Sequence, residues 1–383
     1  MEGFQFQTIK TIRAEPGSSA RIGELIKEIG AERVLVVTDP GIKGLGLLEA
    51  MLSGLDDAGV TVTLYDKVEA DPPEASVLEA GALACESEAE AVIGFGGGSS
   101  MDTAKLASFL ARSDQPLSEA YGVNNARGER LPLIQVPTTA GTGSEVTPIA
   151  IVTTGEATKM GVVSPILYAD YAMLDADLTL GLPSKVTAAT GIDAMVHAIE
   201  AYTTKFKKNP VSNALAREAL SLLGSNIRTA CEDGGNREAR AAMLLGSLLA
   251  GMSFANAPCA AVHALAYPIG GHFHVPHGLS NSLVLPHVLR FNAPVAESQY
   301  AEIAGIAIPG IEASGDAMTE RLAAGFEILI NDLAIESCLR DVGISHNQLP
   351  MMAEDAMKQQ RLLVNNPREV GYDDALEIYQ AAF

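Results

Sequence analysis

Cysteine is scarce in this sequence. The four cysteines lie far apart and form no CxxC pair: Cys85, Cys231, Cys259 and Cys338. This spacing argues against a thiolate zinc site and against a disulfide framework. It is typical of a protein in a reducing compartment, so we expect a cytoplasmic location and expect any metal to be held by nitrogen and oxygen atoms.

Basic side chains are also few relative to acidic ones. The chain has 26 lysines and arginines against 47 aspartates and glutamates, which gives a net charge of −21. Such a charge opposes binding to nucleic acid and to anionic membrane surfaces. We therefore expect a small-molecule partner and no nucleic-acid partner.

The sequence lacks an apolar run long enough to span a bilayer. Residues 241–255, AAMLLGSLLAGMSFA, are uncharged, but they fall short of the roughly 20 apolar residues that a span requires. We expect a buried core helix there and no membrane segment. The N-terminal residues 1–19 carry charged residues where a signal peptide would be apolar, and they are expected to form a pair of strands.

The length of 383 residues favours two domains, each with its own core. In the first half, short β-rich runs alternate with helical patterns, which is typical of βα units and a parallel sheet. The expected strands are RVLVVTD (33–39), TVTLYD (61–66), AVIGFGGG (91–98), LPLIQVPTT (131–139), IAIVTT (149–154) and, as the last strand, YAMLDADL (171–178).

The pattern changes after residue 178, where Ala- and Leu-rich helical stretches follow one another with almost no β-branched runs. The sequence therefore predicts an α/β domain over residues 1–180 and an all-helical domain over residues 181–383.

A glycine-rich loop follows the third expected strand, in AVIGFGGGSSMDTAKLASFL (91–110). Glycines let the backbone approach an anion, and the N–H groups and dipole of the following helix favour a pyrophosphate. A tight strand-to-helix turn is the alternative interpretation. The candidate binding residues are Gly97, Gly98, Ser99 and Asp102.

Asp39 ends the strand RVLVVTD, where a carboxylate could accept hydrogen bonds from ribose hydroxyls. It would repel a 2′-phosphate, which favours NAD over NADP. A helix N-cap is an equally good reading of this aspartate. Because the acid precedes the glycine loop, the nucleotide fold would have an altered strand order.

A second polar loop, PTTAGTGSEVT (137–147), ends another apolar strand. Its hydroxyls and glycines suit the remaining phosphate and the nicotinamide ribose, although an ordinary polar turn is the alternative. The candidates in this loop are Thr138, Thr139, Thr142 and Ser144.

A set of metal-ligand residues occurs in the second half. Asp193 and His197 are four residues apart in an expected helix and so share one face, while His263 and His277 lie in residues 241–289, which contain no charged side chain. One carboxylate and three imidazoles suit Fe²⁺ or Zn²⁺ with an open position for substrate. Each residue also has a structural reading, as a hydrogen-bonded core histidine or a surface Asp–His pair. His272 and His274 alternate with Phe273 and would either line the cleft or support the ligands from behind, and their spacing assigns them no role.

Four motifs together closely resemble the iron-containing, group III alcohol dehydrogenases: GGGSSMDTAK (96–105), PTTAGTGSEVT (137–147), residues 189–197 and HxxxxPxGxxxxxPHG (263–278). The resemblance covers essentially the whole chain. It implies a Rossmann-like N-terminal domain, a helical C-terminal domain of the dehydroquinate synthase-like architecture, a catalytic cleft between them, and a homodimer.

The resemblance also implies roles for residues. Metal ligands would fall on Asp193, His197, His263 and His277. Cofactor contacts would fall on Asp39, Gly97, Gly98, Ser99, Asp102, Thr138, Thr139, Thr142, Ser144 and Lys159. Two positions depart from the family pattern: Tyr267 replaces a histidine linked to proton transfer, and Asp71 replaces an asparagine in a cofactor-binding turn.

The expected activity is NAD-dependent, metal-dependent interconversion of small primary alcohols or diols and aldehydes. Phe254 and Cys259 would be neighbours of the substrate, and the lack of an arginine cluster in the helical part argues against carboxylate substrates. Alternatives are a maleylacetate reductase-like or glycerol dehydrogenase-like oxidoreductase, a metal-dependent hydrolase, and a nucleotide-binding sensor without turnover.

Overall fold

The computed structural model describes residues 3–155, 158–312 and 317–383. The chain divides into two compact units. Unit 1 comprises Met1–Gln7, Ala140–Thr142 and Gly181–Phe383, and unit 2 comprises Thr8–Thr139 and Gly143–Leu180. The expected combination of an α/β part with a helical part is confirmed.

Unit 2 is built on a six-stranded parallel sheet with the order β1-β9-β6-β4-β2-β3. Its strands are β1 (Thr11–Ala14), β2 (Arg33–Val37), β3 (Thr61–Tyr65), β4 (Ala91–Gly96), β6 (Leu133–Pro137) and β9 (Tyr171–Leu174). Every residue of the central strands β4 and β6 is buried. Burial on both faces explains why these strands are continuous apolar runs in the sequence.

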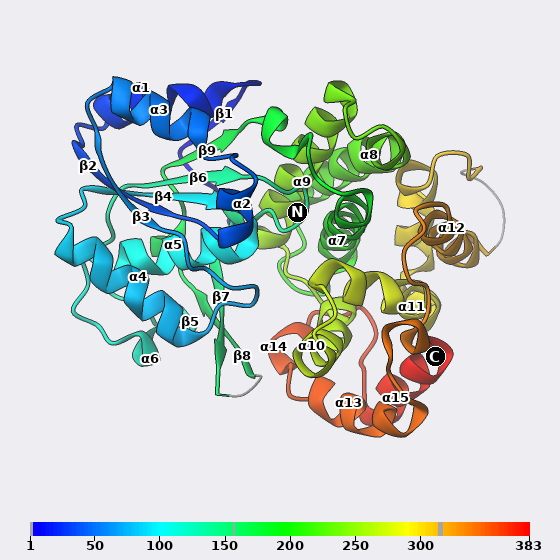
Figure 1. Cartoon of the computed structure of the whole chain (residues 1–383). Helices are drawn as coiled ribbons and strands as arrows, with labels where there is room; N and C mark the ends of the chain where they lie inside the picture. Colours follow the sequence, from blue (N-terminus) through cyan, green and yellow to red (C-terminus); the bar gives the residue numbers. More distant parts are fainter. Residues whose placement is uncertain (1–2, 156–157, 313–316) are drawn as a thin grey trace. The chain divides into compact units, whose positions relative to one another are not determined.

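Helices cover both faces of this sheet (Figure 1). On one face, α1 and α3 pack on Val34 and Val36 of β2 and on neighbouring strands. On the other face, α4 and α5 form a second core with the small sheet described below. The helices of unit 2 are α1 (Ile22–Glu28), α2 (Pro40–Gly44), α3 (Glu49–Asp57), α4 (Glu74–Glu86), α5 (Gly98–Leu110) and α6 (Leu117–Ala120). Its 3₁₀ turns are η1 (Ser18–Arg21), η2 (Ser144–Val146), η3 (Pro165–Leu167) and η4 (Ala176–Thr179).

The prediction that IAIVTT continues the main sheet was wrong. This segment is β7 (Ile149–Thr154), which belongs to a separate three-stranded sheet of order β5-β8-β7. There β7 pairs antiparallel with β8 (Thr158–Val163), and β5 (Gly122–Val123) pairs with β8. Periodicity identifies a strand but not its partner, and the hairpin partner β8, with the sequence TKMGVV, was not predicted.

The N-terminal segment forms one strand and not the expected pair. Among the described residues before Ser18, only β1 is a strand, and it pairs with β9 at the edge of the main sheet. The expected last strand, residues 171–178, is extended only as far as Leu174 and lies second from the edge.

The strand order reverses direction beside β2, which is the topological switch point of the sheet. From β2 the chain moves outward to β3 and then returns to β4 on the opposite side of β2. Such a reversal makes neighbouring loops diverge, and open α/β sheets bind ligands there. The loops after β2, β4 and β6 leave the sheet at the same edge because these strands are parallel, and the backbone N–H of Thr138 donates to the Gly96 carbonyl at 3.0 Å.

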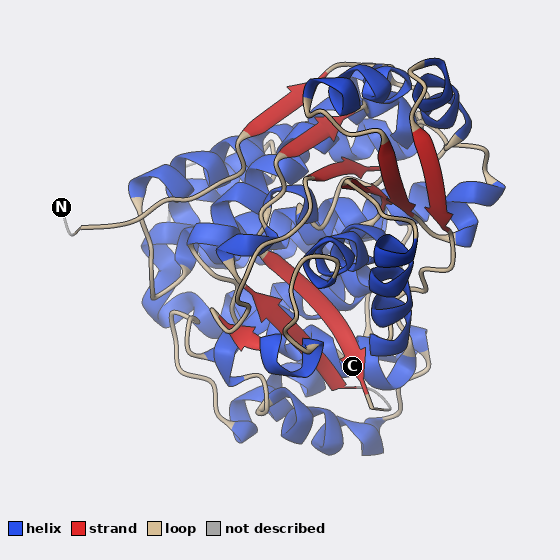
Figure 2. Ribbon diagram, turned by 90° about the vertical axis from the view of Figure 1, so that its left-hand side faces the viewer, coloured by secondary structure: helices blue, strands red, loops and turns tan. Residues whose placement is uncertain are grey.

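Unit 1 is helical. Its helices are α7 (Ser184–Thr203), α8 (Pro210–Glu232), α9 (Arg237–Asn256), α10 (Ala261–Phe273), α11 (His277–Ala307), α12 (Met318–Asp332), α13 (Leu349–Ala356), α14 (Gln360–Leu363) and α15 (Tyr372–Ala381), with the 3₁₀ turns η5 (Leu339–Val342) and η6 (His346–Gln348). Local caps begin two of them: the side chains of Asn209 and Asn236 accept the N–H groups of Ser212 and Ala239. Strands are red in Figure 2 and gather in two groups, which are the two sheets of unit 2.

Residues 241–255 lie within α9, most of which is buried. No single helix in the described parts of the chain is both long and apolar enough to cross a membrane. The pair α9 and α10 passes such a test only when joined, and these two helices are bent by 108°.

Candidate functional site

Two acidic side chains and one imidazole share one face of α7. Asp193, His197 and Glu200 stand at positions i, i+4 and i+7, which project from the same side of a helix. All three are buried, at 2%, 5% and 4% exposure. Polar groups buried along an apolar helix need partners, so this face requires complementary groups from other helices.

Helices α10 and α11 supply those groups. His263 Nε2 and His277 Nε2 lie 3.8 and 3.7 Å from the same oxygen, Oδ1 of Asp193. Gly278 makes the approach of α11 to α7 possible, because a methyl group there would collide with the carbonyl oxygen of Ala189. The structure thus brings together the predicted residues Asp193, His263 and His277.

His197 belongs to a second, overlapping group. Its ring stacks on that of His263, with centroids 4.5 Å apart. The donor atoms of Asp193, His263 and His277 all lie within 4.8 Å of one another, and so do those of His197, His263 and Cys259. His263 is shared, so it links the four predicted ligands into one cluster.

Two ring nitrogens of this cluster are buried without a hydrogen-bond partner among the described residues: Nδ1 of His197 and Nε2 of His263. Unpaired buried polar atoms are costly. Burial lowers the pKa of His197 to about 3, so its imidazole is neutral and has a lone pair to offer. A carboxylate surrounded by imidazoles is a donor set that suits divalent iron or zinc, and the residues therefore fit a metal ion.

Asp193 and His263 both have pKa values shifted by their neighbours. Burial alone would raise the pKa of Asp193, but His197, His277 and His263 outweigh it and hold this pKa below its usual value. Burial opposes a charge on His263, yet Cys259 and Glu200 raise its pKa well above the usual value. The site thus holds one ionised carboxylate against a set of imidazoles.

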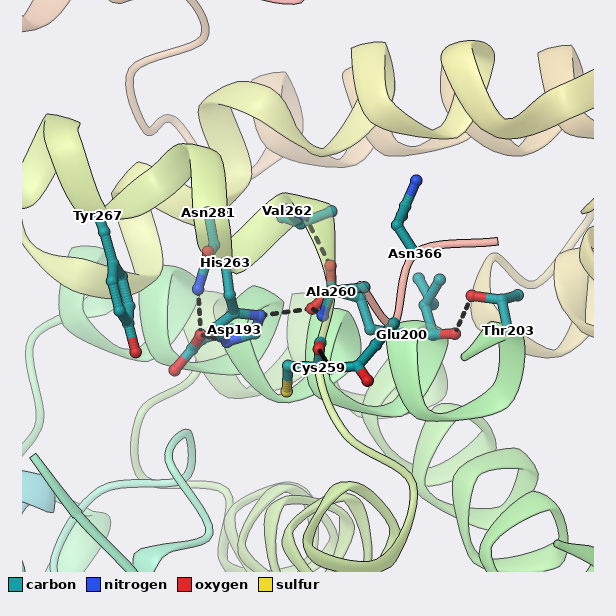
Figure 3. A network of polar contacts seen from close by, with 12 residues as sticks. Asp193, Glu200, Thr203, Cys259, Ala260, Val262, His263, Tyr267, Asn281 and Asn366 are labelled. Carbon is teal, nitrogen blue, oxygen red and sulfur yellow. Dashed lines mark hydrogen bonds and ion pairs between the residues drawn. The ribbon is translucent and has the colours of Figure 1, made fainter. Parts of the chain in front are cut away.

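Glu200 is a site residue that our reading of the sequence missed. Its Oε2 lies 2.6 Å from His263 Nδ1, and its two oxygens accept the backbone N–H groups of Ala260 at 3.0 Å and Val262 at 2.7 Å (Figure 3). This bond leaves Nε2 as the free ring nitrogen of His263. A carboxylate behind a ligating histidine sets its tautomer and orientation. The i+7 spacing from Asp193 was the available signal.

These contacts also replace a local cap. Ala260 is the N-cap residue of α10 and has no side chain that could cap the helix. Glu200 binds the free N–H groups at this terminus from a distance of 60 residues. It therefore fixes both the start of α10 and the His263 ring.

Asn281 was also missed. Its Nδ2 donates to Asp193 Oδ1 at 2.6 Å and lies 3.4 Å from His277 Nε2. It stands one helical turn after His277, so the HGLSN sequence carried the signal. The amide fixes the Asp193 oxygen that faces both histidines.

The uncharged stretch 241–289 has charged partners from elsewhere in the chain. His272 lies 3.1 Å from Asp355 Oδ2 and is exposed, and His274 is the left-handed C-cap residue of α10. The expectation that both line the site is not supported by any contact with the cluster. Phe254 stacks on His197 with centroids 4.3 Å apart.

Tyr267 lies near the open side of the cluster. Its ring centroid is 6.1 Å from that of His277, whose side chain is 41% exposed. Its hydroxyl accepts a hydrogen bond from Arg361 Nη2 at 3.1 Å. Figure 3 shows Tyr267 at the Asp193 end of the network, away from Glu200.

In unit 2, the glycine loop and Asp39 come together at the carboxyl ends of β4 and β2. Asp39 accepts the N–H of Ile42 at 3.0 Å as the N-cap of α2, and its other oxygen accepts Ser100 Oγ at 3.2 Å. Gly96 has φ +150°, and a Cβ there would lie 2.7 Å from Ser100 Oγ. The cap therefore orients the carboxylate toward the loop, so the two readings of Asp39 are compatible.

Asp102 and Ser144 join a network around a buried lysine. Lys105 Nζ donates to Ser144 Oγ at 2.6 Å, to the Ile149 carbonyl at 2.6 Å, and to Asp102 Oδ1 at 3.3 Å. Asp102 also accepts Ser144 Oγ at 2.6 Å and the N–H of Ile151 at 2.9 Å. Both carboxylate oxygens thus have partners within the protein, which favours a role in shaping the loop.

The remaining predicted cofactor residues are dispersed. Thr138 is buried, Thr139 lies near Gly97, and Thr142 falls in the short segment assigned to unit 1. Lys159 is on β8, where its Nζ lies 2.5 Å from Asp71 Oδ1. Asp71 has a left-handed backbone, at φ 56°. Gly98 and Ser99 begin α5, after the N-cap Gly97.

Glu145 predicts a pH dependence of stability. It is 1% exposed, its Oε1 has no partner in the described structure, and burial raises its pKa from 4.5 to about 7. A raised folded-state pKa stabilises the fold fully below pH 4.5, and this stability is lost as the pH rises toward 7.

At pH 8 we expect Glu145→Gln to unfold at a higher temperature than wild type, with a free energy of unfolding about 2 kcal/mol larger. Near pH 5 the two proteins should be equally stable. Thermal unfolding at both pH values tests this. A constant difference between the two proteins across this range would contradict the assignment.

Comparison with known proteins agrees with this geometry. Residues 10–176 match the family described as iron-containing alcohol dehydrogenase, and residues 187–383 match the C-terminal part of the Fe-containing alcohol dehydrogenase family. The chain is 37% identical to sulfoacetaldehyde reductase of Bilophila wadsworthia (strain 3_1_6), covering 99% of both proteins. It is 39% identical to long-chain-alcohol dehydrogenase 1 of Geobacillus thermodenitrificans (strain NG80-2), covering 94% of this chain and 91% of that one.

A solved 1,3-propanediol oxidoreductase is 34% identical, covers 100% of both chains and superposes with a TM-score of 0.94. The family matches account for most of the chain, and they include the segments that carry the cluster and the glycine loop. The chain therefore belongs to the iron-containing alcohol dehydrogenase family, whose members are oxidoreductases acting on alcohols.

Proposed function

We propose that this protein is an NAD-dependent, metal-dependent dehydrogenase that interconverts small primary alcohols or diols and their aldehydes. The observation that carries the proposal is the cluster of Asp193, His197, His263 and His277, in which the first three are buried and two ring nitrogens are unpartnered among the described residues. These four residues are the proposed metal ligands. Their nitrogen and oxygen donors accept iron and zinc alike, and we propose iron on the family's precedent.

These residues would hold a divalent cation, which would supply positive charge beside the alcohol oxygen, and bound NAD⁺ would supply the hydride acceptor. The protein's own groups prepare the site. Glu200 orients the His263 ring, Asn281 orients the Asp193 carboxylate, and Phe254 packs against the His197 ring. The proton that the alcohol loses leaves on the open side, where Tyr267 and the exposed His277 lie.

We infer that NAD⁺ is preferred over NADP⁺. Asp39 holds its carboxylate at the glycine loop through bonds to Ile42 N and Ser100 Oγ. A carboxylate in that place accepts ribose hydroxyls and repels a 2′-phosphate. The loop Gly97–Ser99 and Thr138, Thr139, Thr142 and Lys159 are the further proposed cofactor contacts.

The first experiment measures NADH formation with a panel of primary alcohols and diols. The protein is stripped of metal and reloaded anaerobically with Fe²⁺ or Zn²⁺, and NADP⁺ is run in parallel. Turnover that requires metal and prefers NAD⁺ is the expected result. Folded protein that shows no turnover with any metal and cofactor would refute the proposal.

Glu200 gives a separate prediction. We expect Glu200→Gln to weaken metal binding by about 10- to 100-fold, because the amide no longer holds the Nδ1–H of His263 with a full negative charge. Chelator competition measures the affinity, and the visible spectrum of the Co²⁺-loaded protein reports the ligand geometry.

The matched control for this variant is Glu297→Gln. Glu297 also bonds across helices, to Thr319, but lies outside the cluster. Equal metal affinities for Glu200→Gln and the control would show that Glu200 serves only the start of α10.

We further propose a cytoplasmic homodimer, on the family's precedent and on the scarcity of cysteine. Sedimentation of the metal-loaded protein tests the dimer. A monomer at micromolar concentration would contradict it.

A further inference from the structure

One cation lies at the open side of the cluster. Arg361, on α14, is exposed, and its Cζ is 5.9 Å from the centroid of the Tyr267 ring. Its Nη2 donates to the Tyr267 hydroxyl at 3.1 Å. Tyr267 in turn lies 6.1 Å, between ring centroids, from the proposed ligand His277. The guanidinium of Arg361, the phenol of Tyr267 and the imidazole of His277 therefore follow one another in space.

Arg361 has unused binding capacity. A guanidinium has five N–H donors in a planar fork, and only the bond to Tyr267 engages a side chain in the described part of the molecule. No carboxylate of the described residues pairs with it, whereas Asp355 on α13 is engaged by Lys358 at 2.8 Å and by His272 at 3.1 Å. The phenol oxygen accepts from Arg361, so its own O–H is available as a donor.

The charge balance of the site also favours an anion beside Arg361. A divalent ion on the cluster would compensate the two buried carboxylates, Asp193 and Glu200. Arg361 is then an uncompensated positive charge beside the site, in a chain whose net charge is −21. Such a charge attracts an anionic substrate to a protein that otherwise repels it.

We propose that Arg361 and the hydroxyl of Tyr267 form a subsite for the anionic end of the substrate, so that the enzyme prefers short alcohols or aldehydes that carry a terminal carboxylate or sulfonate. This inference rests on the proposed function. The alcohol oxygen would occupy the metal cluster while the anion binds the guanidinium fork, which matches two oxygens of either group. The reaction is still hydride transfer to NAD⁺ with release of one proton.

The sequence did not predict this subsite. Arg361 lies far along the chain from residues 241–289, and the apparent lack of arginines there argued for neutral substrates. The fold brings α14 against α10 and removes that argument.

The test compares matched neutral and anionic substrates on the metal-loaded enzyme with NAD⁺. The pairs are 1-propanol with 3-hydroxypropanoate, and ethanol with 2-hydroxyethanesulfonate, so that the carboxylate and sulfonate arms are separate. The variants are Arg361→Met and Tyr267→Phe, and Lys205→Met serves as a control that removes an exposed cation from the same unit.

We expect wild type to favour the anionic member of at least one pair. Arg361→Met should lower the anionic-to-neutral ratio of kcat/KM by about 10- to 100-fold, as for one charge-assisted pair, while Lys205→Met keeps the ratio. Tyr267→Phe should lower the ratio less. A ratio within twofold of wild type in Arg361→Met would overturn the proposal.

Failure of the proposed dehydrogenase function can be distinguished from failure of the anion subsite. If neither member of any pair is turned over, calorimetric titration of the metal-loaded protein with 2-hydroxyethanesulfonate and 3-hydroxypropanoate decides the question. Binding that Arg361→Met weakens at least tenfold would support the subsite without the dehydrogenase activity. Binding that does not depend on Arg361, or no binding at all, would refute it.

Discussion

Replacing His263 with alanine is expected to abolish metal retention and to lower turnover by about 10³-fold or more. His263 is the residue shared by the two groups of donor atoms, so its loss removes a ligand from both. It also leaves the buried Glu200 without its imidazole partner. Metal content after dialysis and the rate of NADH formation measure the two effects.

A matched control is His346→Ala, which removes an imidazole from η6 far from the cluster in sequence and in contact with Phe383. The control should keep both metal and activity. Stoichiometric metal in His263→Ala, with turnover within tenfold of wild type, would remove His263 from the ligand set.

Lys105→Met is expected to have the second large effect, a loss of about 3 kcal/mol in the free energy of unfolding. Lys105 is 0% exposed, and its ammonium joins α5 to the loop at Ser144 and to β7. Methionine removes these bonds and leaves the Asp102 carboxylate without its cation. The same change should weaken NADH binding, because the loop that flanks the glycine turn loses its anchor.

A double variant makes this prediction specific. Asp102→Asn combined with Lys105→Met should cost less than the sum of the two single changes, because the pair interacts. The exposed Lys27→Met is the control for loss of one positive charge. Additive effects in denaturant unfolding would mean that the two residues stabilise the fold independently.

Local patterns predicted much of the fold. The buried parallel strands are continuous apolar runs, and β4 ends in glycines that only a tight approach to α5 requires. The partner of a strand is non-local information. IAIVTT has the same pattern as a strand of the main sheet, and nothing in its own residues shows that it pairs with β8 in a separate sheet.

The site residues also fall into those that local sequence patterns predict and those that depend on non-local contacts. Spacing within one helix predicted Asp193 with His197, and it also carried Glu200, which we did not recognise because a glutamate in a helix is usually solvated. Arg361 could not be found by spacing, since its only link to the site is a contact across 94 residues. Residues that ligate through their own helix face are therefore predictable, and those that act through another helix are not.

Glu200 has a consequence for exchanging parts between relatives. Helix α10 has no cap of its own, and the information that starts it resides in α7. A peptide of residues 258–275 should be largely non-helical in water, whereas α8 begins with its own Asn209 cap. A chimera that takes α10 from a relative without the matching α7 would lose the contacts that position His263. The two helices should therefore be exchanged together.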